Sequence, residues 1–147
     1  MEIWVLGTLE VSHDGRAVDI RGSLPRRLLA LLALTPGQEV SAEALIDGLW
    51  GEDPPAAASA TLQSHVARLR RDLPGTDVVR TGRHGYVLRV DAVDVDSHRF
   101  AALIAAGSAA LVRGHLDEAS EQLTEALELW RGTPYAEFDG AEALDAE

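Results

Sequence analysis

The sequence of 147 residues contains no cysteine, no lysine and no long apolar run. Without cysteine the chain forms neither a disulfide nor a thiolate metal site, which is typical of a protein in a reducing cytosol. The longest apolar run, Leu28–Leu34, is far shorter than the roughly 20 residues that a membrane-spanning helix needs. The N-terminus lacks the basic and apolar regions of a signal peptide. These absences predict a cytoplasmic protein that makes no membrane contact.

The sequence also lacks the patterns of a catalytic or metal site. Its five histidines, at positions 13, 65, 84, 98 and 115, show no metal-ligand spacing. It has no glycine-rich loop that would cradle a phosphate and no pairing of a nucleophile with a base. The sequence therefore predicts no catalytic residue, no metal and no cofactor, and a protein that is not an enzyme.

Acidic residues outnumber basic ones, 24 against 13, but the two signs are unevenly placed. Residues 1–90 carry ten arginines and eleven acidic side chains, whereas residues 91–147 carry three arginines and thirteen acidic side chains. Residues 54–90 alone hold six arginines and two aspartates. Because salt screens charges beyond about 10 Å, local patches decide whether phosphate is attracted. The asymmetry predicts two units, one suited to nucleic acid and an acidic one that meets protein.

The first third of the chain has the pattern of a small sheet followed by helices. Gly7 predicts a bend or bulge within the first strand, and Asp14-Gly15 is a strong hairpin signal. Ser23 and Pro25 predict the start of a leucine-rich helix, and Trp50 is expected to be a core anchor near the end of the next helix. The predicted order is strand, turn, strand, helix, very short strand and helix, over residues 2–11, 12–15, 16–20, 24–34, 38–40 and 42–50.

A helix predicted over residues 56–73 separates an apolar face from a basic one. At 100° per residue, one line holds Leu62, Val66, Leu69 and Leu73. The opposite face is small and then basic, and no acidic residue occurs between Ala56 and Arg71. An ordinary solvated helix mixes glutamate with arginine, so this face indicates a helix that enters a DNA groove. The base-facing residues are predicted to be Thr61, Ser64 and Arg68, with Gln63, His65 and Arg70 on the flanks.

Two strands predicted over residues 78–81 and 86–90 follow this helix as a hairpin. A helix-turn-helix followed by a hairpin is the winged-helix arrangement, in which the second helix enters the major groove and the wing touches the backbone or minor groove. Phosphate contacts are therefore predicted for Arg26, Arg27, Arg71, Arg80, Thr81, Arg83 and His84. Arg26 and Arg27 stand in the first turn of their helix, where cations are disfavoured, so a phosphate there and plain solvation are equally consistent. His84 is equally consistent with a simple turn residue.

The C-terminal part is predicted to be helical and acidic. After an acidic connector over residues 91–96, helices are predicted over residues 97–113 and 117–131, joined at Gly114. They resemble one tetratricopeptide-like unit, with small residues at the contact between the helices. One such unit does not bury its face alone, so the chain is expected to be cut within an α-helical repeat domain. The predicted fold class is α+β: a winged helix-turn-helix with an N-terminal antiparallel sheet over residues 1–91, then the start of an all-α domain over residues 96–147.

A series of different short motifs runs through nearly the whole chain. They are Leu6-Gly7, Leu9-Glu10-Val11, Arg26-Arg27 with the leucines after them, Val40-Ser41, Leu45, Leu49-Trp50, the run from Thr61 to Arg71, Thr81, Gly85–Leu88, Asp96 with Phe100, and Ala126–Gly132. In this order they resemble the Streptomyces antibiotic regulatory protein family. Its members join a winged-helix domain of the response-regulator type to an α-helical bacterial transcriptional activator domain.

The resemblance implies a transcription activator that binds direct repeats of double-stranded DNA upstream of antibiotic or other secondary-metabolism genes and recruits RNA polymerase holoenzyme. It implies a homodimer or tandem binding on DNA, and a cytoplasmic, nucleoid-associated protein. Because the chain opens on the winged-helix strand, no receiver domain is expected ahead of it. The alternative is an interaction module whose winged helix contacts protein and does not bind DNA, which the basic surface of the helix over residues 56–73 disfavours.

Overall fold

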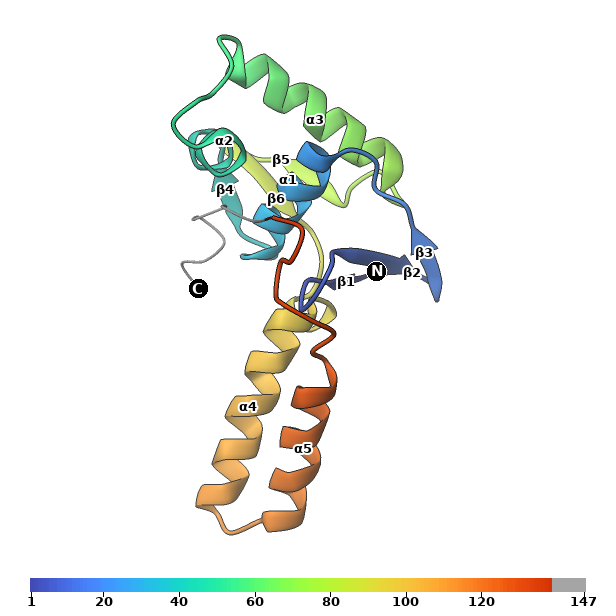
Figure 1. The fold of residues 1–147 in the computed structure, drawn as a ribbon, viewed down its shortest axis with the longest axis vertical. Helices are drawn as coiled ribbons and strands as arrows, with labels where there is room; N and C mark the ends of the chain where they lie inside the picture. The colour runs from blue at the N-terminus through green and yellow to red at the C-terminus, as the bar shows by residue number, and fades with distance from the viewer. Residues whose placement is uncertain (139–147) are drawn as a thin grey trace.

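The computed structural model describes residues 1–138 as a winged-helix body from which a helical hairpin projects (Figure 1). Of the segment predicted to begin another element at residues 132–147, residues 139–147 lie outside the described part. The α+β fold class is confirmed. The elements are β1 (Glu2–Trp4), β2 (Glu10–His13), β3 (Arg16–Val18), α1 (Ser23–Ala33), β4 (Glu39–Ser41), α2 (Ala42–Trp50), α3 (Ala58–Asp72), β5 (Val79–Thr81), β6 (Gly85–Leu88), the 3-10 turn η1 (Ala92–Asp94), α4 (Asp96–Val112) and α5 (Leu116–Glu128).

The N-terminal sheet corrects one prediction. Residues 2–11 form two strands and not one, because the chain reverses around Gly7, whose φ of 144° favours glycine. β1 then pairs antiparallel with β2, and Ile3 stands opposite Val11. The predicted turn at Asp14-Gly15 is confirmed: both residues have positive φ, 50° and 75°, as a two-residue hairpin turn requires.

The core of the body surrounds α1. Leu28, Leu29 and Leu32 of this helix are completely buried, and α2 and α3 both pack against it. The apolar line predicted on the third helix is confirmed, since Leu62, Val66 and Leu69 of α3 are buried. Each fully buried leucine of this kind contributes about 1.5–3 kcal/mol relative to exposure. This packing fixes which face of α3 remains on the surface.

The wing sheet has the order β4-β6-β5, so the predicted hairpin gains a third strand from the segment before α2. The very short strand predicted over residues 38–40 is confirmed at Glu39–Ser41. Gly85 pairs with Ser41, and the backbone N–H of Ala42 donates to the His84 carbonyl at 2.9 Å. The wing is therefore attached to the first turn of α2 and does not hang free.

The helical hairpin packs through small side chains, as its sequence predicts. Gly107 of α4 lies against Leu123 of α5, and Ala110, Ala119 and Ala126 are buried. The predicted second helix is shorter than expected, because α5 ends at Glu128. None of the helices within residues 1–138 combines the length and apolarity that crossing a bilayer requires. The hairpin and α3 lie at opposite ends of the molecule (Figure 1).

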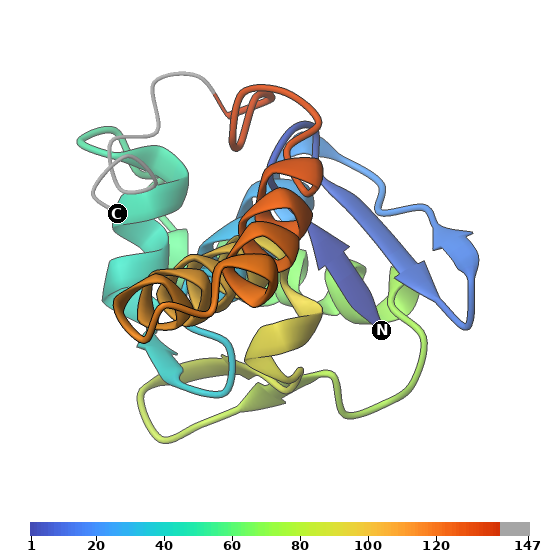
Figure 2. The same cartoon turned by 90° about the horizontal axis from the view of Figure 1, so that it is seen from below.

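Residues 130–138, here called the strap, lead from the hairpin back to the N-terminal sheet. The backbone N–H groups of Arg131 and Tyr135 donate to the carbonyls of Leu6 and Val5, both at 2.8 Å. Phe138, at the end of the described chain, is buried in the core of the body. In the view from below, the hairpin lies over the middle of the body, with the N-terminal sheet and the wing on different sides of it (Figure 2).

The start of α4 is held by the same part of the body. The Asp96 carboxylate is buried and accepts hydrogen bonds from the backbone N–H groups of Val5 at 2.7 Å and Leu6 at 3.0 Å. His98 Nε2 lies 3.2 and 2.9 Å from two carbonyl oxygens at the C-terminal end of α1. The hairpin is thus joined to the body at both of its ends.

Candidate nucleic-acid interface

The outward face of α3 is open along its length. Ser64, Arg68 and Arg71 are exposed on the side opposite the buried leucines, and Gln63 is exposed on the flank. Within residues 1–138, Arg68 and Arg71 make no hydrogen bond and no ion pair, so their guanidinium donors are available to a ligand. The structure therefore brings together two of the three residues predicted to face bases, Ser64 and Arg68, with Arg71 one turn beyond.

Thr61 and Gln63 have different surroundings on α3. The Thr61 hydroxyl donates to the Ala57 carbonyl at 3.0 Å, so its proton is engaged within its own helix and its oxygen can only accept from a ligand. Gln63, predicted on a flank, is exposed. An exposed amide side chain has the donor and the acceptor that bidentate contact with adenine requires.

His65, on the other flank, faces the neighbouring helix. Its ring lies 6.1 Å from that of Trp50, and its Nδ1 is buried without a hydrogen-bond partner among the described residues. Burial lowers the pKa of His65, and the nearby charge of Arg68 lowers it further. The imidazole is therefore neutral near pH 7, and its position favours helix packing over DNA contact. Trp50 is half-buried against the core, in keeping with the anchor role predicted for it.

The lowered pKa of His65 predicts a pH dependence of folding. The unfolded chain takes up this proton near the ordinary pKa of about 6.5, whereas the folded chain takes it up only at lower pH. The contribution of neutral His65 is thus complete above pH 6.5 and is lost as pH falls below it. The free energy of unfolding of the natural chain, minus that of His65→Leu, should decrease between pH 7.5 and 5. A difference that stays constant, or an NMR-titrated pKa of His65 at or above 6.5, would contradict this.

Arg70 connects α3 to the wing. Its Nε donates to the Val79 carbonyl and its Nη2 to the Thr81 hydroxyl, both at 2.9 Å, and its guanidinium lies 5.8 Å from the centre of the Tyr86 ring. Two residues predicted at the flank or at phosphate, Arg70 and Thr81, are thus bonded to each other. These contacts tie α3 to the strands β5 and β6 of the wing.

The wing presents further arginines. Arg80, Arg83 and His84 are exposed, and the two arginines line a hollow of about 890 Å³ between the wing and the N-terminal sheet. Arg89 also lines the hollow, but it forms an ion pair with Asp77. Arg80 and Arg83 have no ion-pair partner within residues 1–138, so both are available to phosphate.

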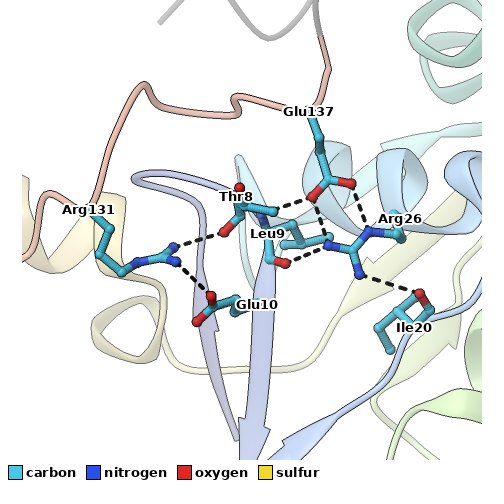
Figure 3. A network of polar contacts seen from close by, with 7 residues as sticks. All are labelled: Thr8, Leu9, Glu10, Ile20, Arg26, Arg131 and Glu137. Atoms are coloured by element: carbon cyan, nitrogen blue, oxygen red, sulfur yellow. Dashed lines mark hydrogen bonds and ion pairs between the residues drawn. The ribbon is translucent and has the colours of Figure 1, made fainter.

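Arg26 is placed differently from the other predicted phosphate contacts. Its Nε and Nη2 donate to the two carboxylate oxygens of Glu137, both at 2.7 Å (Figure 3). The same guanidinium also donates to the carbonyls of Leu9 at 2.5 Å and Ile20 at 3.3 Å. The hydrogen bonding between Arg26 and Glu137 raises the pKa of Arg26 and lowers the pKa of Glu137. Since its donors are occupied by the chain itself, Arg26 belongs to an internal network and not to the outer face.

Two more arginines hold elements together. Arg27 Nη1 lies 3.4 Å from the Leu49 carbonyl, which connects α1 to α2. Arg131, in the strap, donates to the Thr8 carbonyl at 2.9 Å and pairs with Glu10 at 3.2 Å (Figure 3). No local sequence pattern indicates Glu137 or these roles, because each contact joins residues that are far apart along the chain.

Two family models match the sequence on either side of the connector. The model described as "Transcriptional regulatory protein, C terminal" matches residues 22–88, and the "Bacterial transcriptional activator domain" matches residues 95–147. The regulatory protein DnrI of Streptomyces peucetius is 41% identical over 90% of this chain, and the transcriptional regulator RedD of Streptomyces coelicolor is 38% identical over 90%. The chain belongs to the Streptomyces antibiotic regulatory protein family. This is a family of transcriptional regulators.

Solved structures extend the comparison to the whole fold. EmbR of Mycobacterium tuberculosis, described in complex with a low affinity phosphopeptide, superposes with a TM-score of 0.91 and 32% identity. The match covers 98% of the present chain and 39% of the EmbR chain. The chain likewise spans 52% of the length of DnrI and 39% of that of RedD. The winged-helix body and its helical hairpin are therefore shared with EmbR, which is a longer protein.

Proposed function

We propose that this family member binds double-stranded DNA sequence-specifically and activates transcription of antibiotic or other secondary-metabolite genes. The observation that carries the proposal is the outward face of α3, which is basic, has no acidic side chain before Asp72 and keeps Arg68 and Arg71 free of partners within residues 1–138. In this proposal Ser64, Gln63 and Arg68 read base edges. The phosphate contacts come from Arg71, Arg80, Arg83 and His84.

In this proposal residues 1–91 bind DNA, and residues 96–147 bind a protein partner. The hairpin lies at the opposite end of the molecule from α3, so it stays accessible when α3 occupies a groove (Figure 1). Its charge is acidic, which repels DNA and leaves this end to protein partners. We propose RNA polymerase holoenzyme as that partner, and direct repeats bound by two copies, in tandem or as a dimer, as the DNA site.

Arg68→Ala tests the base-reading role. It should weaken binding to the selected site by about 1–3 kcal/mol, which is roughly 5- to 150-fold, and relax the preference at one base position. The measurement is a dissociation constant on the selected duplex and on variants of it, with Arg113→Ala at the far end of the hairpin as the charge-matched control. A loss that is uniform across sequences would instead make Arg68 a phosphate contact.

The whole proposal is tested by a salt series on random duplex. Attraction to phosphate is strongest at low salt, and the logarithm of affinity should fall linearly with the logarithm of salt concentration. No binding at low salt would overturn the DNA-binding function and leave a protein-interaction module as the alternative.

A further inference from the structure

A separate basic hollow lies where the end of α3 meets the turn from β3 into α1. It measures about 400 Å³ and is lined by Arg21, Gly22, Arg68, Arg71 and Asp72. Arg68 and Arg71 stand three residues apart on one helix, whereas Arg21 comes from the turn before α1. Only the fold brings the third arginine to the other two, and sequence periodicity does not single out Arg21.

The arginine side chains of the hollow are exposed, and only that of Arg21 forms an ion pair within residues 1–138. The Asp72 carboxylate accepts the backbone N–H of Arg21 at 2.9 Å, which ties the turn to the end of α3. This bond uses the backbone of Arg21 and leaves its side chain 83% exposed, with a 3.9 Å contact to the equally exposed Asp19. Three arginines thus line the hollow together with one carboxylate, Asp72, and the Asp19 carboxylate lies beside Arg21 outside the lining.

We propose that this hollow holds a phosphate of the DNA backbone, with Arg21 and Arg71 as its ligands; the inference rests on the proposed function. Seven residues separate Ser64 from Arg71, a rise of about 10 Å along the helix axis. The major groove is about 12 Å wide. With Ser64 over the bases, Arg71 therefore reaches the backbone at the edge of the groove, and Arg21 closes on the same phosphate from the body.

The chemistry of the lining favours phosphate. Guanidinium groups donate paired, charge-assisted hydrogen bonds to phosphate oxygens, and two such groups can hold one phosphate from two sides. The hollow is continuous with the basic face of α3 through Arg68, which belongs to both. Arg68 reaches toward the bases while Arg21 and Arg71 hold the strand, so the hollow sets how far α3 penetrates the groove.

Arg21→Gln and Arg71→Gln test the site, with Arg113→Gln as the matched control. Each hollow variant should weaken binding about 5-fold or more, equally on selected and random duplexes, and lower the salt slope by about one. Because the Arg21 side chain is exposed and not part of the hydrophobic core, we expect Arg21→Gln to fold. Circular dichroism checks this. A neutral methylphosphonate scanned along the duplex should remove the effect of Arg21→Gln at one position.

The outcomes separate the two proposals. If the natural chain binds DNA and Arg68→Ala weakens it, but Arg21→Gln matches Arg113→Gln, the phosphate site is overturned and the function stands. A loss for Arg21→Gln that depends on base sequence also overturns the phosphate site. Failure of the natural chain to bind duplex at low salt overturns the proposed function itself.

Discussion

Asp96→Ala is expected to lower the free energy of unfolding by about 2–6 kcal/mol. The carboxylate is only 3% exposed and accepts two backbone N–H groups, from Val5 and Leu6. Its removal leaves two buried donors unsatisfied, and each costs about 1–3 kcal/mol. The measurement is urea-induced unfolding followed by circular dichroism. Because this contact joins α4 to the first sheet, its loss also loosens the hairpin from the body.

Asp91→Ala is the control for this prediction. Asp91 is exposed and sits only five residues earlier, so the variant removes the same charge without uncovering a buried donor. Its effect should stay within about 0.5 kcal/mol, as for most surface substitutions. If both variants lose the same stability, the Asp96 contact is not what holds the two parts together.

Gly85→Ala is expected to destabilise the chain by about 3 kcal/mol or more and to weaken DNA binding through the wing. A Cβ at this position would press on the Val40 carbonyl, 2.7 Å from its carbon, and lie 2.8 Å from the Ser41 Cα. Both neighbours are backbone atoms of β4, so they cannot turn aside as a side chain would. The pairing of β4 with β6 must open, which adds to the usual cost of overpacking. Thermal unfolding and duplex affinity measure the two effects.

Gly82→Ala in the same wing provides the comparison. There the added Cβ meets the carboxylate end of the Glu39 side chain, which can rotate into solvent. The expected loss is below about 1 kcal/mol. Equal losses for the two variants would show that the wing tolerates neither substitution for a common reason, such as backbone freedom, and would contradict the close approach at Gly85.

The strap and Asp96 hold the helical hairpin against the winged-helix body. The winged-helix body includes Val95 and Phe138 in its core, so segments on both sides of the hairpin help to complete the body. The Arg26–Glu137 pair and Arg131 reinforce the same boundary (Figure 3). A hairpin held in this way has a fixed orientation relative to α3. In the proposed function, a protein bound at the hairpin is therefore placed at a defined distance and angle from the DNA site.

Much of the fold could be predicted because its signals are local. The apolar line through Leu62, Val66 and Leu69, the Asp14-Gly15 turn and the small residues between α4 and α5 each follow from a period or a turn of a few residues. The reversal of the chain at Gly7 could not be predicted, because a glycine within an alternating run is compatible with both a bulge and a turn. Packing of Gly7 against Arg131, 124 residues later, accompanies the reversal.

The sequence by itself determined that a basic, non-acidic helix face stands opposite an apolar one, because helical periodicity sorts neighbouring residues without any tertiary contact. Only the tertiary structure decided which arginines are free. Arg26 and Arg70 carry the same charge as Arg71, yet they are bonded to Glu137 and to the wing, while Arg71 meets Arg21 at an open hollow. Whether a guanidinium faces solvent or the chain depends on what the fold brings beside it, and the partner of Arg26 lies 111 residues away in the sequence.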